Sequence, residues 1–70
     1  SIYPNPTKGN FTIELSGDFN YEVMDARGRL IFKGKASDLV DLSMEACESG
    51  VYLIKIKNEV SENSYRIIKQ

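Results

Sequence analysis

The stretch Gly50–Lys57, with the sequence GVYLIKIK, is the most apolar run of the chain and decides its fold class. Its side chains alternate in character, so that Tyr52, Ile54 and Ile56 fall on one face and the two lysines on the other. Alternation at a period of two is typical of a β-strand that packs one face on a core and turns the other to water. We therefore predict a central strand of a sheet here.

A hairpin is predicted on the N-terminal side of this strand. Tyr21–Asp25 and Arg29–Lys33 both read as strands, and only the residues Ala26, Arg27 and Gly28 separate them. A glycine in so short a connection supplies the positive φ that tight hairpin turns need. We expect the two runs to pair in an antiparallel fashion.

Further strand-like runs lie along the rest of the chain. Asn10–Leu15 alternates clearly, and a polar turn over residues 58–63 is expected to bring the last run back beside Gly50–Lys57. Ser43–Gly50 has helical features for at most one turn. About seven short strands are expected at intervals of roughly ten residues. They are Ile2–Tyr3, Asn10–Leu15, Tyr21–Asp25, Arg29–Lys33, Leu39–Leu42, Gly50–Lys57 and Ser64–Gln70. This spacing predicts an all-β fold, an antiparallel two-sheet β-sandwich of the immunoglobulin-like kind.

Composition restricts the chemistry that the chain can perform. Its 70 residues, 41% of them hydrophobic and with a formal net charge of −1, suit one small domain over residues 1–70. The chain contains no His, the commonest general base and transition-metal ligand. Its single cysteine, Cys47, can form neither an internal disulfide nor a zinc site, and we expect it to be a half-buried apolar residue. We expect no enzyme activity, no cofactor, no catalytic or metal-binding residue, no nucleic-acid partner and no insertion into a membrane.

The tyrosines leave one alternative open. Four tyrosines could form a stacking surface for sugars or bases, but the alternating placement of Tyr21 and Tyr52 favours packing in the core. The residues by themselves therefore indicate a small β-domain that serves as a recognition or structural module.

Four local blocks carry a resemblance to a known family. They follow one another as Tyr3–Gly9 (YPNPTKG), Asp25–Leu30 (DARGRL), Ser49–Ile56 (SGVYLIKI) and Arg66–Gln70 (RIIKQ). In this order and spacing they cover nearly all of the chain. The sequence resembles the type A C-terminal sorting domain of the type IX secretion system, also called the Por secretion system, of Bacteroidetes bacteria.

The resemblance implies an export signal at the end of a larger exported protein. Family members pass through the periplasm, are recognised by the type IX translocon and an outer-membrane shuttle protein, and are commonly removed by a gingipain-like sortase during surface attachment. The cargo then lies at the cell surface or is secreted. A monomer is expected for this domain, with a strand-swapped dimer as the alternative.

The matching positions divide into structural and recognition residues. We expect turn or motif roles, and a core role for the tyrosine, at Asn5, Pro6, Gly9, Asp25, Gly28, Gly50 and Tyr52. Asn5 is expected to hydrogen-bond a nearby backbone group. The recognition residues are expected at the C-terminus, where a partner could add a strand: Arg66, Ile67, Ile68, Lys69 and Gln70. We predict that deleting residues 68–70 abolishes export while most of the fold remains.

One rival hypothesis comes from another class of function. An immunoglobulin-like or fibronectin-like adhesion or carbohydrate-binding module would stay on the mature protein. Position in the full-length protein discriminates the two, because a sorting domain must end the polypeptide, whereas a binding module can lie anywhere.

Overall fold

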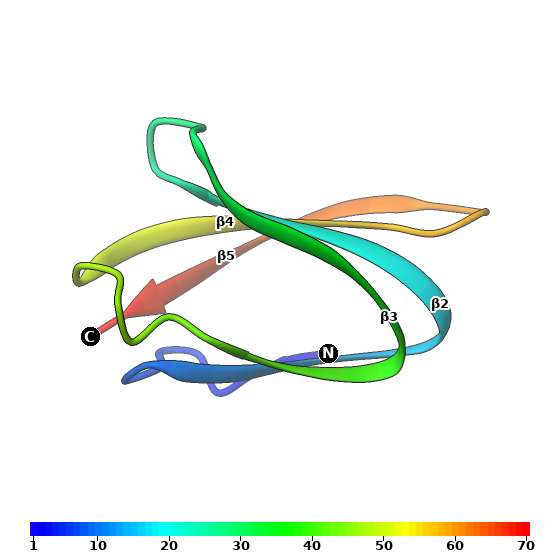
Figure 1. The fold of residues 1–70 in the computed structure, drawn as a ribbon, viewed down its shortest axis with the longest axis horizontal. Coiled ribbons are helices and arrows are strands. Elements are labelled where there is room, and N and C mark those ends of the chain that lie inside the picture. Colours follow the sequence, from blue (N-terminus) through cyan, green and yellow to red (C-terminus); the bar gives the residue numbers. More distant parts are fainter.

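A computed structural model describes residues 1–70 and contains five strands and no helix (Figure 1). The strands are β1 (Ile2–Tyr3), β2 (Asn10–Asp25), β3 (Leu30–Ser43), β4 (Gly50–Lys57) and β5 (Glu62–Lys69). All of them pair in an antiparallel fashion in one sheet of order β1-β2-β4-β5, and β3 pairs with β2. No helix long and apolar enough to cross a membrane is present.

The long hairpin of β2 and β3 is bent in its middle. The regular pairing of the two strands is interrupted between Leu15 and Asp18. On β2, Gly17 has a φ of 86°, and on β3 the facing Asp38 has a φ of 67°. The backbone N–H of Gly17 donates to Oδ1 of Asp38 at 2.8 Å. Left-handed residues on both strands redirect the hairpin, so that its two halves lie in facing layers of one curled sheet (Figure 1).

The bend corrects the expected strand count. Asn10–Leu15 and Tyr21–Asp25 are the two halves of β2, and Arg29–Lys33 and Leu39–Leu42 fall in the two halves of β3. The small polar residues between the halves resemble turns in the sequence but form the bend of continuous strands. The molecule is an all-β half-barrel of five strands, and the predicted two-sheet immunoglobulin-like sandwich of about seven strands is not confirmed.

Other expectations about local structure are confirmed. The hairpin between β2 and β3 pairs Glu22 with Lys33 and Val23 with Phe32. β4 lies between β2 and β5, and the last run folds back beside it. Between β3 and β4 the chain forms hydrogen-bonded turns and no helix, with the N–H of Cys47 donating to the carbonyl oxygen of Met44 at 2.9 Å, and the side chain of Met44 is buried.

The hydrophobic core lies between the two layers. Its buried side chains come from β2, β4, β5 and the loop after β3: Phe11, Ile13, Phe19, Val23, Met44, Tyr52, Ile54, Ile56 and Ile67. Cys47 is half-buried and packs against this cluster, as expected. Only 11 of the 70 residues are buried. Single hydrogen bonds and single core side chains therefore contribute a large fraction of the stability of so small a fold.

Candidate recognition site at the C-terminal strand

The C-terminal strand presents two different faces. Ile67 is fully buried and lies opposite Tyr52 of β4. Arg66 and Ile68 lie on the outer face, where Ile68 is 39% exposed opposite Val51. Of the predicted recognition residues, the structure thus places Ile67 in the core and leaves the side chains of its two neighbours accessible.

The outer edge of β5 is covered at its C-terminal end by the segment that precedes β2. The side chain of Asn5 donates from Nδ2 to the carbonyl oxygen of Arg66 at 2.9 Å and accepts at Oδ1 from the N–H of Ile68 at 3.0 Å. The N–H of Thr7 donates to the carbonyl oxygen of Ile68, and the N–H of Gln70 donates to the carbonyl oxygen of Thr7, both at 2.8 Å. This edge is therefore already paired, and a partner strand could add here only by displacing it.

Asn5 thus bonds to the other end of the chain, whereas a bond to a nearby backbone group was expected. Its flanking residues Pro4 and Pro6 have no N–H to offer a neighbouring strand. A primary amide carries one acceptor and two donors, so it can replace a peptide group in the ladder. Pro6 itself is exposed, and both prolines follow cis peptide bonds.

Thr7 is a structural residue that the sequence analysis missed. Its side chain is 1% exposed, and its hydroxyl donates to the carbonyl oxygen of Asn10 while accepting from the N–H of Gly9 at 3.0 Å. A threonine whose hydroxyl accepts from the N–H two residues later is a known turn pattern, and the glycine at that position was the available clue. Gly9 is buried and lies close against the side chain of Glu45.

The loop between β3 and β4 is tied to the same end of the molecule. Nζ of Lys69 donates to the carbonyl oxygen of Cys47. The hydroxyl of Tyr52 donates to the carbonyl oxygen of Glu48 at 2.6 Å. Burial raises the pKa of this tyrosine, and nearby negative charge at Glu48 adds to the effect. Tyr52 is 7% exposed and lies in the core, as expected.

Asp25 organises the turn of the β2–β3 hairpin. Its Oδ1 accepts from the N–H groups of Arg27 and Arg29, each at 2.9 Å. Its Oδ2 lies 2.8 Å from Nε of Arg29 in an ion pair. The backbone hydrogen bond from Arg29 holds the pKa of Asp25 below its ordinary value, and the guanidinium strengthens the shift. Gly28, with a φ of 85°, donates its N–H to the carbonyl oxygen of Asp25.

The four sequence blocks meet in one row across the sheet. Asp25 of β2 pairs with Tyr52 of β4, and Tyr52 pairs with Ile67 of β5. Asn5 flanks this row through its bonds to the residues on either side of Ile67. Gly50 lies at the start of β4 opposite Lys69. Segments that are far apart in the sequence therefore hold the C-terminal strand in place together.

A comparison with known families identifies the family of the chain. The model of the secretion system C-terminal sorting domain matches residues 1–70, the whole chain. The chain belongs to this family. A sorting domain of this family is a C-terminal export signal for type IX secretion, it works with the type IX machinery, and its cargo is exported to the cell surface or secreted. A comparison with curated proteins gives no match.

Proposed function

We propose that this sorting domain is a cleavable export address, read in the periplasm by the translocon and a shuttle protein and then removed by a gingipain-like sortase. In this role the domain is a substrate of the sortase and performs no chemistry of its own. The observation that carries the proposal is the convergence of the four sequence blocks on β5, with Asn5 and Tyr52 on either side of the strand.

The predicted recognition residues act in two ways in this proposal. Ile67 and Lys69 anchor the strand, through the core and through the loop carbonyl of Cys47. Arg66, Ile68 and Gln70 offer the parts that a partner reads. Because the C-terminal end of the β5 edge is paired with residues 5–7, recognition at this end proceeds through exposed side chains rather than through strand addition.

The export function is tested by fusing residues 1–70 to the C-terminus of a fluorescent protein that carries a periplasmic signal peptide. The fusion is expressed in a bacterium with an intact type IX system and in a sister strain that lacks the translocon. We expect fluorescence at the surface or in the medium of the intact strain only. Retention in the periplasm of both strains would contradict the proposal and favour an adhesion module.

The C-terminal residues are tested by deleting residues 68–70 from the same fusion. Export is expected to be lost, while circular dichroism of the purified domain keeps its β-signal. The deletion also removes three hydrogen bonds to Asn5 and Thr7, so a lower melting temperature accompanies it. Val60→Ser, at a turn residue that is 89% exposed, is the control and should be exported normally. Normal export of the deletion would exclude these residues as the address.

Removal by the sortase is tested on the exported fusion. In the intact strain we expect the exported fluorescent protein to lack the 7.9 kDa domain. In a strain without the sortase, the exported or surface-retained protein should keep it. Equal masses in the two strains would contradict cleavage while leaving the export function standing.

A further inference from the structure

The outer face of the layer formed by β4, β5 and the adjoining halves of β2 and β3 is divided into an apolar part and a basic part. In an antiparallel sheet, directly paired residues share a face. One row across this face runs from Leu30 through Met24 and Leu53 to Arg66. The next pair beside it on β4 and β5 is Val51 and Ile68. The apolar part of the face consists of Met24, Leu30, Val51, Leu53 and Ile68.

This apolar part is accessible to solvent although its residues are large. Leu30, Val51, Leu53 and Ile68 are between 37% and 50% exposed, and they face away from the core. A folded monomer rarely gathers several large apolar side chains in one exposed patch unless they contact something. Arg66 lies within the patch, on the strand that contains the predicted recognition residues.

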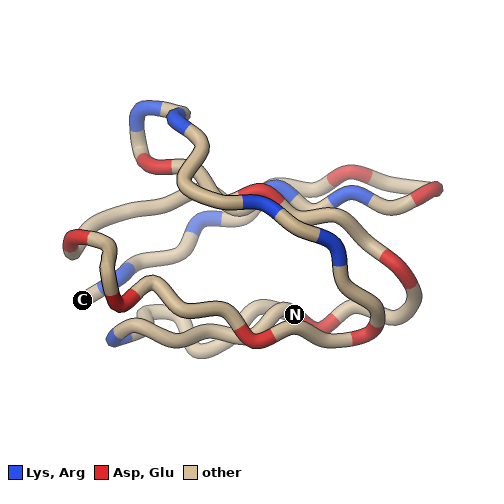
Figure 2. The backbone as a smooth tube through the Cα atoms, in the orientation of Figure 1, with Lys and Arg blue, Asp and Glu red and all other residues tan.

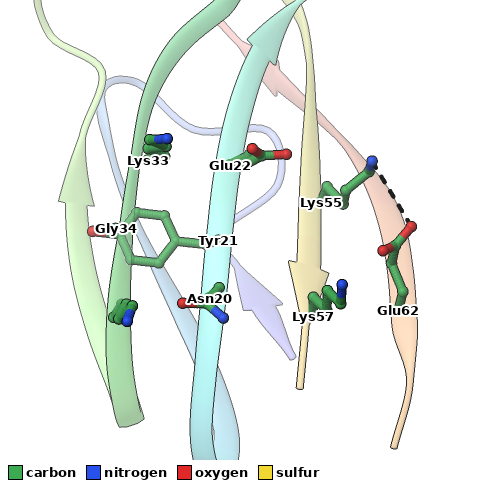
Figure 3. Close-up of a pocket in the computed structure, with 9 residues that line it drawn as sticks. Asn20, Tyr21, Glu22, Lys33, Gly34, Lys55, Lys57 and Glu62 are labelled. Carbon is green, nitrogen blue, oxygen red and sulfur yellow. Dashed lines mark ion pairs between the residues drawn. The ribbon is translucent and has the colours of Figure 1, made fainter. Parts of the chain in front are cut away.

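The basic part lies next to it on the same strands. Two rows cross the sheet here. In one, Glu22 of β2 lies between Lys33 of β3 and Lys55 of β4, and in the other, Asn20 lies between Lys35 and Lys57. Together with Glu62 these side chains line a surface hollow of about 510 Å³ (Figure 3). Lys55 and Glu62 form the one ion pair among them, at 3.8 Å. The other three lysines form no ion pair, although Lys33 has Glu22 as its cross-strand neighbour.

The outer face just described is more positive than the rest of the chain. The outer face just described carries five cationic and two anionic side chains, a balance of +3: Lys33, Lys35, Lys55, Lys57, Arg66, Glu22 and Glu62. The whole chain has a net charge of −1, so the remainder carries −4. Figure 2 shows most of the basic positions on the layer with β4 and β5, whereas acidic positions lie on both layers and around the bend.

We propose that this outer face docks onto a protein of the export machinery whose surface has an apolar centre and an acidic rim. The inference rests on the proposed export function, and it specifies the kind of protein surface that would bind the layer containing β5. An apolar centre with a polar, charged rim is the usual anatomy of a protein interface. Carboxylates on the partner would complement the excess positive charge of this face, and complementary charge steers association and selects the partner.

The test uses the fluorescent fusion that carries residues 1–70, expressed in the intact strain, and examines two variants. Leu53→Thr combined with Ile68→Thr removes apolar anchors while keeping side chains that suit strands. Lys35→Glu reverses a charge whose cross-strand neighbour is the neutral Asn20, so no like-charged pair arises directly opposite. Each variant is expected to lower export by about tenfold or more, the effect of losing an interface anchor. Lys35→Arg, which keeps the positive charge, should be exported at the wild-type level.

Matched controls lie on other surfaces. Leu39→Thr removes an apolar side chain that is 46% exposed on the opposite layer, and Lys8→Glu makes the same charge change outside the proposed face. Both should be exported at the wild-type level. Melting temperatures identify any variant that has lost stability. If the double variant unfolds, Lys35→Glu alone decides, because its exposed side chain makes no ion pair.

Three outcomes would overturn the inference. Export of the folded double variant or of Lys35→Glu at the wild-type level would show that this face is not the docking surface. Equal losses of export in the control variants would show that the effect is not specific to this face. Co-sedimentation of the purified chain with phosphatidylglycerol vesicles, lost in Lys35→Glu, would assign the face to a lipid surface instead. If the unmodified fusion itself is not exported, the proposed export function fails as well, so the two failures are distinguishable.

Discussion

The side-chain amide of Asn5 occupies the place that a peptide group of a further strand would take beside β5. It donates to Arg66 and accepts from Ile68, so one residue satisfies two backbone groups at the edge of the sheet. The sequence predicted a hydrogen-bonding role for Asn5 but could not supply the partners, because they lie 61 and 63 residues away. Local patterns show which groups need partners, and only the fold decides where these are found.

Asn5→Ala should therefore destabilise the domain by about 1–3 kcal/mol, because it leaves two backbone groups of β5 without their partners. Urea denaturation measures the loss, and hydrogen exchange at the Ile68 amide should become faster. Asn20→Ala, at an exposed amide that makes no hydrogen bond, is the control and should change stability by less than about 0.5 kcal/mol. Equal losses of unfolding free energy in the two variants would show that the hydrogen bonds of Asn5 do not stabilise the domain.

Asp25 predicts a dependence of stability on pH. The hydrogen bonds and the ion pair in the hairpin turn hold its pKa below the ordinary value of 3.8. The ionised carboxylate therefore favours the folded state at pH values above about 4, and this contribution is lost as the pH falls through the lower pKa of the folded chain.

The measurement is the melting temperature of the wild type and of Asp25→Asn between pH 7 and pH 2. The wild type should melt higher above about pH 4 to 5, and the difference should shrink towards pH 2. Asp18→Asn, at an exposed carboxylate without a hydrogen-bond partner, is the matched control. A difference between wild type and Asp25→Asn that is the same at every pH would contradict the assignment.

For the strands, the alternation of apolar and polar residues predicted correctly which side chains face the core. It did not predict that β2 and β3 each continue through the bend as one strand. The inward placement of Tyr52, Ile54 and Ile56 follows from a period of two, and the structure confirms it. The polar residues around Gly17 and Asp38 were interpreted as breaks between strands. Glycine and aspartate serve tight turns and bends of a continuous strand equally well, because both tolerate positive φ. Only the pairing of β2 with β3 across the bend distinguishes the two.

The pairing of β2 with β3 also contains a close contact that the sequence analysis did not notice. Gly34 lies opposite Tyr21, and the tyrosine ring lies over the glycine (Figure 3). A Cβ at position 34 would lie 2.7 Å from Cζ of Tyr21, too close for both to keep their places. Glycine is thus required here so that an aromatic side chain can cover the backbone of the neighbouring strand.

A double-mutant cycle tests this pairing. Gly34→Ala should cost about 1–3 kcal/mol in the wild type, because the ring of Tyr21 must move. In a Tyr21→Ala background the same substitution should cost little, since the space is then free. Urea denaturation of the four proteins gives the interaction energy, which should lie well above about 0.5 kcal/mol. Additive effects would show that the ring does not need the glycine.

For the molecule as a whole, the unpaired edge of β3 is the main hazard of the half-barrel. β3 has 14 residues and pairs with β2 alone, so its other edge is free along its length. Free edges of this length invite pairing with a second copy. Two features oppose this. Lys33 and Lys35 place charge on one half of the edge strand, and the left-handed Asp38 interrupts its regular geometry.

We therefore expect a monomer, and we expect Lys33→Val combined with Lys35→Val to associate as its concentration rises. Light scattering after size-exclusion chromatography measures the mass of each species. Lys55→Val combined with Lys57→Val is the matched control, because it makes the same change in charge and apolar surface on the same face, but on the central strand β4. If both pairs of substitutions cause equal association, added apolar surface is responsible. Association of the first pair alone assigns it to the edge, because of the two strands only β3 has backbone N–H and C=O groups free to pair with another chain.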